Sequence, residues 1–257
     1  MTQALDADAL CAQYLDTTMA LMRRILAEER DSLDRAAQRV AEQITADRLV
    51  HVYGPGGHSN LAAQEIFFRA GGLMHVSAIL DEGTLLSNGA LRSMAIERTP
   101  GYAKAVIADQ TLGEGDLLIL VNAYGINAAL IDAAIEARRN GVFLIGVSSR
   151  EHAESTRAEH PARHPTRANL HDLVDIAIDC KVPIGDAVLR LDGMSQDIAA
   201  ISTFANAYAL NSLVIRTVAK LVDQGIEPPV WRSGNAPDGD ALNGRFIAKF
   251  RNRVRWL

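Results

Sequence analysis

The chain has 257 residues, a length that suits one large domain or two small ones and allows a full hydrophobic core. Hydrophobic residues make up 48% of it and charged residues 22%, which is the composition of an ordinary globular protein. The formal net charge is −5, and no long basic run interrupts the sequence. These values argue against nucleic acid as the main partner, because affinity for a phosphate backbone needs clustered Lys and Arg.

The cysteines and the N-terminal residues indicate the cellular compartment in which the protein is expected. Cys11 and Cys180 form neither a disulfide framework nor the paired spacing of a zinc site. The N-terminal segment contains "DADAL" where a secretory signal would have a basic patch and an apolar run. No apolar stretch approaches the roughly 20 residues that cross a bilayer. We therefore expect a reduced, cytoplasmic protein that partners neither a membrane nor nucleic acid.

The N-terminal part of the chain has the periodicity of helices. Over residues 7–45, apolar side chains recur at steps of three and four residues. These side chains belong to Leu10, Tyr14, Leu21, Ile25, Leu33, Ala37, Val40 and Ile44. Helices are therefore expected before the main domain begins.

From residue 48 the pattern changes to short apolar runs, each followed by turn residues and a helical stretch. Continuous apolar strands separated by helices predict a parallel sheet that is buried on both faces. The runs are "LVHVYG" (49–54), "MHVSAI" (74–79), "LLILVNA" (117–123), "VFLIGVSS" (142–149) and "LVDIAID" (173–179). The sequence thus predicts an α/β fold with a doubly wound, five-stranded parallel sheet.

Three C-terminal segments follow the predicted sheet. Residues 195–223 are largely apolar and predict one long helix. Glycine and proline dominate residues 224–244, whereas "RFIAKFRNRVRWL" (245–257) has the spacing of a helix with a solvated basic face. We expect a single domain with N-terminal helices, an α/β core and a C-terminal tail at 1–46, 47–224 and 225–257.

The first candidate ligand-binding loop is "GPGGHSN" (54–60), which ends the first predicted strand. Open α/β sheets bind ligands at the carboxyl ends of their strands. Glycines allow a sharp turn and close approach to a ligand, and Ser59 or Asn60 can cap the following helix, whose free N–H groups favour an anion such as phosphate. The stretch is neither a Walker loop nor the dinucleotide motif G-x-G-x-x-G. A structural turn with a serine cap explains it as well as a phosphate cradle does.

Two further polar loops end the third and fourth predicted strands, at "NAYGIN" (122–127) and "SSRE" (148–151). Their hydroxyl and amide groups can hydrogen-bond a ligand, and a glycine gives room for close approach. The residues concerned are Asn122, Tyr124, Gly125, Asn127, Ser148 and Ser149. An ordinary strand–turn–helix connection with Asn127 as the helix cap is the alternative for the first of these loops. Three polar turns at one edge of a sheet together favour a polar, phosphorylated small molecule as ligand.

Six stretches carry a resemblance to a known family. They are "GPGGHSNLAAQEIFFRAGG", "AIERTPGYA", "LILVNAYGINAALIDAA", "ARHPTRANLHDLVDIAID", "VPIGDA" and "ISTFANAYALN", and they lie between about residues 48 and 245. In their order and spacing they resemble the sugar isomerase (SIS) domain family of phosphosugar-binding proteins, and most closely a bacterial subgroup related to phosphoheptose isomerases. The resemblance implies an α/β/α fold, a sugar phosphate as ligand, and a homodimer or homotetramer with sites near the subunit interface.

The resemblance has one departure in the loop after the third strand. SIS proteins usually carry Ser-x-Ser-Gly there, with hydroxyls that hold the phosphate, whereas this chain has Asn122 and Tyr124. An asparagine amide can still donate a hydrogen bond, but tyrosine is far bulkier than serine. The departure therefore points to a different sugar derivative as a possible ligand.

Two glutamates are candidates for the base that aldose–ketose isomerisation requires. Glu65 follows the glycine turn, and its stretch "EIFFR" resembles the Glu-x-x-x-Arg of phosphoheptose isomerases, where the glutamate is catalytic. The alternative for Glu65 is an i,i+4 ion pair with Arg69. Glu97 is the second candidate, and the Thr99–Pro100 pair beside it has the pattern of a helix cap and first turn.

Histidines are candidates for the proton shuttle, because imidazole titrates near neutral pH. His58 in the glycine turn and His164 in a polar loop match histidines that the resemblance implies. The alternatives are a turn residue bonded to backbone for His58 and an exposed loop residue for His164. His160 lies four residues before His164, but Pro161 and Pro165 argue against the helix that a metal pair needs. We expect no metal and no cofactor.

The long C-terminal helix lacks the histidine that phosphoheptose isomerases supply from this position. Its polar residues include Thr203 and Asn211, which either contact ligand or satisfy each other in a dimer core. The expected substrate-binding residues are Gly56, Gly57, Ser59, Asn122, Tyr124, Gly125, Asn127, Ser148, Ser149 and Thr203.

A non-catalytic sugar-phosphate sensor and a sugar-phosphate lyase or etherase remain alternatives to the isomerase. No helix-turn-helix is evident in the N-terminal helices, which disfavours a self-contained transcription factor.

Overall fold

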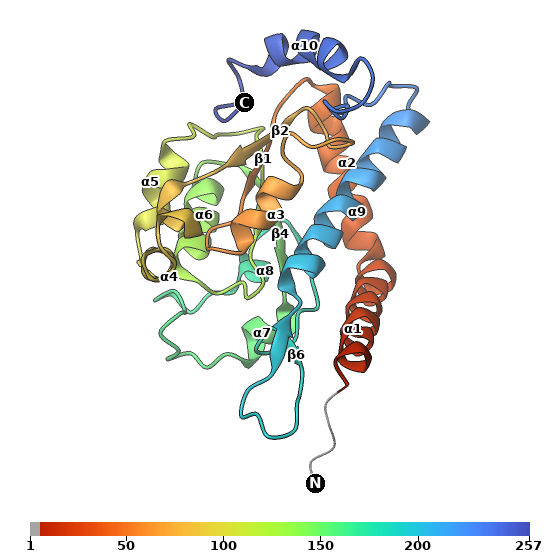
Figure 1. Ribbon diagram of the computed structural model, residues 1–257. Coiled ribbons are helices and arrows are strands. Elements are labelled where there is room, and N and C mark those ends of the chain that lie inside the picture. Colours follow the sequence, from red (N-terminus) through yellow and green to blue (C-terminus); the bar gives the residue numbers. More distant parts are fainter. Residues whose placement is uncertain (1–5) are drawn as a thin grey trace.

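The computed structural model describes residues 6–257, and its centre is a parallel sheet between two layers of helices (Figure 1). The strands hydrogen-bond in the order β2-β1-β3-β4-β5, and every neighbouring pair is parallel. They are β1 (Val50–Tyr53), β2 (Val76–Ile79), β3 (Leu117–Val121), β4 (Phe143–Ser148) and β5 (Ile176–Asp179). Each lies within one of the five predicted apolar runs, so the predicted fold class is confirmed.

The central strand β3 shows why the sequence of this sheet is continuously apolar. Its five residues are all buried, and they alternate between two separate hydrophobic clusters. Leu117, Ile119 and Val121 belong to the cluster on one face, whereas Leu118 and Leu120 belong to the cluster on the other. Both faces of the sheet therefore require an apolar side chain at each position.

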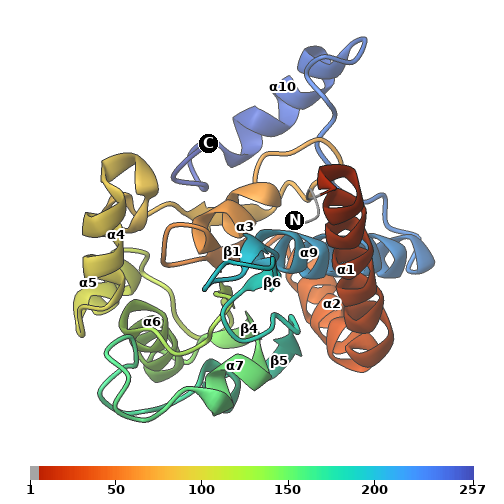
Figure 2. The same cartoon turned by 60° about the horizontal axis from the view of Figure 1, so that its bottom comes forward.

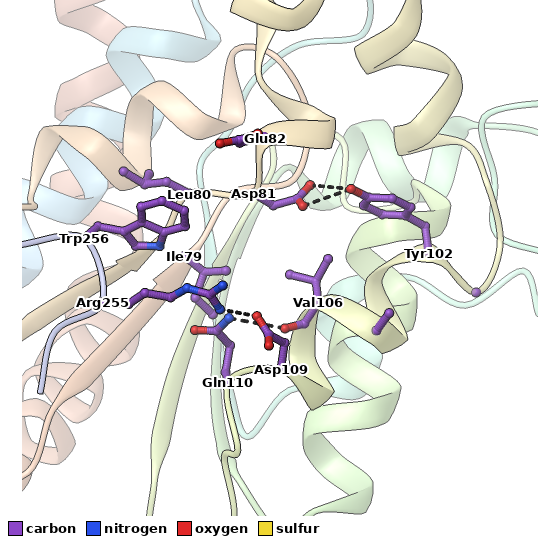
Figure 3. Close-up of a pocket in the computed structure, with 12 residues that line it drawn as sticks. Ile79, Leu80, Asp81, Glu82, Tyr102, Val106, Asp109, Gln110, Arg255 and Trp256 are labelled. Atoms are coloured by element: carbon purple, nitrogen blue, oxygen red, sulfur yellow. Dashed lines mark hydrogen bonds and ion pairs between the residues drawn. The ribbon is translucent and has the colours of Figure 1, made fainter.

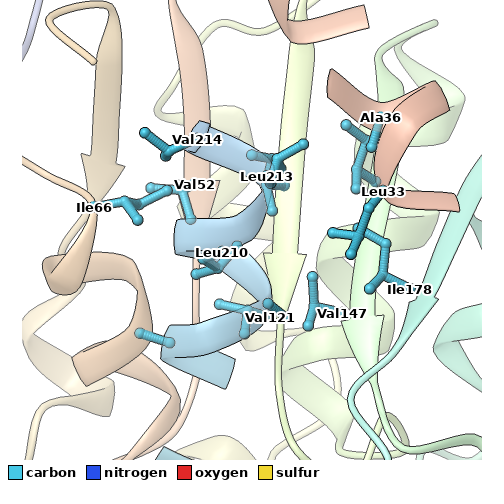
Figure 4. Close-up of a cluster of buried hydrophobic side chains, with 14 of the residues drawn as sticks. Leu33, Ala36, Val52, Ile66, Val121, Val147, Ile178, Leu210, Leu213 and Val214 are labelled. Carbon is cyan, nitrogen blue, oxygen red and sulfur yellow. The ribbon is translucent and has the colours of Figure 1, made fainter. Parts of the chain in front are cut away.

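Different helices cover the two faces, as Figure 2 shows. One face packs against α1 (Ala7–Glu28), α2 (Arg30–Thr45), α3 (Ser59–Glu65) and α9 (Ser202–Asp223). The other packs against α5 (Tyr102–Ala108), α6 (Ala128–Arg139) and α8 (Leu170–Leu173). Leu210 and Leu213 of α9 lie directly over the strands near Val121 (Figure 4). This helix is thus fixed against the sheet by apolar burial along one side.

The remaining elements connect the layers or extend them. They are the 3₁₀ turns Glu82–Thr84 and Leu86–Asn88, α4 (Ala90–Glu97), α7 (Arg150–Ser155), β6 (Ala187–Leu189), β7 (Ile198–Ala200) and α10 (Gly239–Phe250). No helix among residues 6–257 is both long and apolar enough to cross a membrane.

The predicted N-terminal helical region consists of two helices that meet at Glu29. The ammonium group of Lys181 lies at this junction, 2.7 Å from Glu29 Oε1 and 3.1 Å from Glu28 Oε2. The same ammonium lies 3.1 Å from Asp179 Oδ2 at the end of β5. One partly buried cation therefore ties the helix junction to the sheet.

The long C-terminal helix begins later than predicted. Residues 198–200 form β7, which pairs antiparallel with β6, and α9 starts only at Ser202. Asp186 sets this start, because its carboxylate accepts hydrogen bonds from the N–H groups of Ile201 and Ser202 at 3.0 and 2.7 Å. The expectation of helix from residue 195 is therefore wrong for its first seven residues.

The predicted basic helix at the C-terminus also has different bounds. Helix α10 spans Gly239–Phe250, and residues 251–257 form turns. Its end is held by apolar contacts among Met74, Trp231, Phe250 and Val254. This cluster docks the C-terminal segment beside strand β2, where the segment can shield an edge of the sheet.

Candidate functional site

A small polar pocket lies at the carboxyl ends of β1 and β3, where an open α/β sheet binds its ligands. Its volume is about 120 Å³. The residues that line it come from the glycine turn, the end of α4, the loop after β3, the turn before β6 and the start of α9. They are Gly56, Gly57, His58, Ser59, Glu97, Asn122, Ala123, Tyr124, Asp186, Ser202 and Asn206.

Glu97 brings a carboxylate into this pocket from the last residue of α4. Two amides hold its Oε1 atom: Asn127 Nδ2 donates at 2.7 Å and Asn122 Nδ2 at 3.2 Å. Burial raises the pKa of Glu97 to about 7, against the opposing effects of the Asn122 hydrogen bond and the Arg98 charge. A carboxyl group with this pKa can both accept and return a proton near neutral pH.

Glycine is required opposite Glu97. Gly56 has a φ of +112°, a conformation that other residues rarely adopt. A Cβ atom at this position would lie 2.6 Å from Glu97 Oε1. The glycine turn therefore serves to admit the Glu97 carboxylate to the pocket.

Asn122 connects the glycine turn to the loop after β3. This residue is 3% exposed, and its Nδ2 lies within hydrogen-bond distance of Pro55 O and Ser59 Oγ as well as Glu97. Its Oδ1 accepts hydrogen bonds from the backbone N–H groups of Tyr124 and Gly125 at 3.0 and 3.1 Å. Asn122 thus fixes both loops around the carboxylate.

Other parts of the wall come from Tyr124, Asp186, Ser202 and Asn206. The ring of Tyr124 stacks on His152, with ring centroids 4.0 Å apart. Burial raises the pKa of Tyr124 and lowers that of His152. Asp186 Oδ2 accepts a hydrogen bond from Ser202 Oγ at 2.7 Å, so this carboxylate holds the start of α9 against the pocket.

Most of the predicted residues of the first two loops come together here. Six of them line the pocket: Gly56, Gly57, His58, Ser59, Asn122 and Tyr124. Asn127 contacts the pocket through its hydrogen bond to Glu97, and Gly125 donates its N–H to Asn122. The side-chain caps that we considered are absent from both helix starts, since neither Ser59 nor Asn60 caps α3 and the Asn127 amide bonds Glu97 instead.

Several other predicted residues lie outside the pocket. Glu65 pairs with Arg69 at 3.1 Å and accepts a hydrogen bond from Asn211 at 3.2 Å. These contacts match the structural alternative for Glu65. Thr203 is partly buried in the first turn of α9 but does not line the pocket.

Ser148, Ser149 and His164 also lie outside the pocket and make contacts elsewhere. Ser149 caps α7 and donates its hydroxyl to Val182 O at 2.6 Å, while buried Ser148 packs under Gly125. His164 is 7% exposed, with Nε2 3.3 Å from Asp132 Oδ1. The alternative of an exposed loop residue is therefore wrong for His164.

The structure also corrects the role expected for Thr99 and adds three residues to the pocket. The Thr99 hydroxyl donates to Ala95 O of α4, and Gly101 precedes α5, so Thr99 follows the end of α4 and does not cap the next helix. Asp186, Ser202 and Asn206 were missed as pocket residues, although "VPIGDA" and "ISTFANAYALN" contain them. Their periodicity indicated only strand ends and an apolar helix. Among residues 6–257, no group of three or more His, Cys, Asp or Glu could hold a metal ion.

A second, larger pocket of about 570 Å³ lies at the edge of the sheet (Figure 3). It is lined by the end of β2, by α5, and by Arg255 and Trp256 near the C-terminus. Two of its carboxylates have protein partners, since Tyr102 donates to Asp81 and Arg255 pairs with Asp109. None of the predicted site residues lies in it.

Sequence comparison places the chain in a family. Residues 13–149, just over half of the chain, match the family model described as the SIS domain. The chain belongs to the SIS domain family. Relatives of this SIS domain protein include a UPF0309 protein of Halalkalibacterium halodurans, 34% identical over 248 residues, which cover 96% of this chain and 97% of the relative. A UPF0309 protein of Streptomyces griseus is 36% identical over 247 residues, which cover 95% of this chain and 96% of the relative.

Solved structures of low sequence identity share the SIS domain fold. Phosphoheptose isomerase GmhA from Neisseria gonorrhoeae matches with a TM-score of 0.56 and 14% identity, over 85% of this chain and 100% of the isomerase. The Vibrio vulnificus NanR protein complexed with ManNAc-6P matches with a TM-score of 0.54 and 15% identity. The match covers 94% of this chain and 69% of the NanR chain. At these identities the comparisons show the common fold.

Proposed function

We propose that this SIS domain protein binds a sugar phosphate or a related sugar derivative and isomerises it between aldose and ketose, with Glu97 as the base. The observation that carries the proposal is the Glu97 carboxyl group, which two amides hold in the pocket with a pKa of about 7. The fold shared with a phosphoheptose isomerase and with a ManNAc-6P complex supports the class of ligand.

The geometry assigns different tasks to the two oxygens of Glu97. Both amide hydrogen bonds go to Oε1, whereas Oε2 has no hydrogen bond within residues 6–257. In the proposed reaction, Oε2 removes the proton from the carbon beside the carbonyl and returns it to the neighbouring carbon. His58, exposed at the glycine turn, moves the second proton between the two oxygens of the substrate.

Glu97 is preferred to Glu65 because of their partners. Glu65 is outside the pocket, and the guanidinium of Arg69 lies against its carboxylate. The carboxylate of Glu65 is already paired with a cation, whereas neutral amides hold Glu97 without adding a charge. The chain thus offers two glutamates in contrasting surroundings.

Deuterium exchange tests this assignment. The protein is incubated with a panel of aldose and ketose phosphates in deuterated water, and deuterium at C1 and C2 is followed by NMR. We expect exchange that Glu97→Gln abolishes and that the matched variant Glu65→Gln retains. Equal exchange in Glu97→Gln and wild type would refute Glu97 as the base. Thermal stabilisation by a sugar phosphate without exchange would instead indicate a non-catalytic sensor.

We also propose that the protein is a homodimer or larger homo-oligomer with the pocket near the interface. Helix α9 exposes Phe204, Ile215 and Val222, which are 47, 68 and 56% exposed. The first turns of the same helix line the pocket, so a second subunit on this face would lie beside it. Sedimentation should show an oligomer that Ile215→Lys weakens, and a monomeric wild type at micromolar concentration would contradict the proposal.

A further inference from the structure

The charge of the pocket is unusual for a site that receives phosphate. Glu97 and Asp186 both line it, and no Lys or Arg is among the described residues that do. The exposed imidazole of His58 is the one lining side chain that can carry a positive charge. A phosphate dianion inside the pocket would therefore face two acidic groups without a permanent cation.

The amide donors that hold Glu97 are already committed. The Nδ2 groups of Asn122 and Asn127 donate to Glu97. On the neighbouring loop, the Ser149 hydroxyl donates to Val182 O. A phosphate that used these donors would displace the Glu97 carboxylate or break the hydrogen bond from Ser149 to Val182 O.

The volume also limits what can enter. The pocket holds about 120 Å³, whereas sites that enclose a whole small molecule usually measure about 300 Å³ or more. One end of a sugar derivative therefore fits, and the rest of the molecule extends beyond the lining residues.

Asn206 supplies an unused pair of hydrogen-bonding groups inside the pocket. It lies in the second turn of α9, is 2% exposed, and has a buried Oδ1 with no hydrogen-bond partner within residues 6–257. Its Nδ2 likewise makes no hydrogen bond in the described part of the chain. A buried orphan acceptor is costly, so a ligand group that pairs with this amide would remove that cost. A hydroxyl group suits it, because a hydroxyl both donates and accepts.

We propose that the ligand enters this pocket with its uncharged, hydroxyl-bearing end, that Asn206 binds a hydroxyl of that end, and that the phosphate stays outside. This inference rests on the proposed function and makes it more specific. Asn206 becomes a substrate-binding residue, and the pocket selects for the carbonyl and hydroxyl groups on which Glu97 acts.

Binding measurements on three variants test the inference. Calorimetry on the sugar-phosphate panel compares wild type with Asn206→Leu, which keeps the size of the side chain and removes both polar groups. The matched control is Asn211→Leu, a substitution on the same helix outside the pocket. We expect Asn206→Leu to weaken sugar-phosphate binding about tenfold, the loss expected for one buried hydrogen bond, and the control to leave it within about twofold. Binding within about twofold of wild type in a folded Asn206→Leu would overturn the inference.

Competition on the unmodified protein supplies a second readout that needs no variant. We expect the dephosphorylated sugars to displace a bound sugar phosphate, whereas millimolar inorganic phosphate does not. Displacement by inorganic phosphate that depends on Ser59 would place the phosphate inside the pocket and refute the inference. Deuterium exchange that still depends on Glu97 would then leave the proposed function intact, whereas a panel without any binding or exchange would remove both.

Discussion

Glu97 and Glu65 are both candidate bases from the sequence, but they lie in different physical settings. Glu97 is held inside a polar pocket by the uncharged amides of Asn122 and Asn127. Glu65 lies on the α9 side of the sheet, beside the cation of Arg69. Neutral donors can orient a carboxylate while burial keeps its pKa high, whereas a cation favours the ionised form. The type of partner, more than the glutamate itself, distinguishes a candidate base from a structural residue.

The largest effect is expected when the space that Gly56 leaves for the Glu97 carboxylate is removed. In Gly56→Ala, the new Cβ would lie 2.6 Å from Glu97 Oε1. We expect deuterium exchange to fall at least about a hundredfold, because small displacements of a catalytic group cost this much. The matched control is Gly89→Ala, since Gly89 has a similar φ of +107° and its Cβ would have no neighbour closer than 3.8 Å. Equal losses in the two variants would mean that backbone strain, not contact with Glu97, explains the effect.

A smaller loss is expected when the shorter of the two amide bonds is removed. Asn127→Leu keeps the volume of the side chain but eliminates the 2.7 Å donor to Glu97. We expect exchange to fall about tenfold and the pKa seen in its pH profile to rise, because a lost donor destabilises the ionised carboxylate. Asn211→Leu, which removes a contact of Glu65 but none of Glu97, serves as control. An unchanged pH profile in Asn127→Leu would show that this amide does not position the base.

A smaller effect of Glu97 is expected on the pH dependence of the free energy of unfolding. Its pKa is about 7 in the folded chain and 4.5 in the reference state, so the folded state binds more protons between these values. The free energy of unfolding therefore falls as pH rises from 4.5 to 7, and this dependence is absent in Glu97→Gln. We expect the variant to gain about 3 kcal/mol relative to wild type across this range. Denaturant unfolding of both proteins at several pH values measures the difference, and parallel curves would contradict the raised pKa.

The sheet could be predicted from the sequence because its signal is local. Five apolar runs separated by helical stretches identify the buried strands, and the order of the elements places the glycine turn and the loop at Asn122 on the same edge. Both loops do line the pocket. The exact start of α9 was missed because it depends on Asp186, a residue distant from that helix in sequence.

The choice between the two glutamates could not be predicted, because it depends on contacts between distant segments. Glu97 reaches the pocket only through the path of α4, which brings it to Gly56 and Asn127. Nothing in the periodicity of "AIERTPGYA" indicates this path. Asn206 was overlooked for a similar reason, since one polar residue in an apolar helix gives no local sign of what it faces.

The pH dependence of deuterium exchange in wild type, Glu97→Gln and Glu65→Gln tests the role of Glu97 most directly. With Glu97 as the base, exchange rises with pH and levels off above about pH 7, where its carboxyl group is ionised. The same profile should persist in Glu65→Gln and vanish in Glu97→Gln. A wild-type profile that survives in Glu97→Gln, or one that disappears in Glu65→Gln, would contradict the assignment.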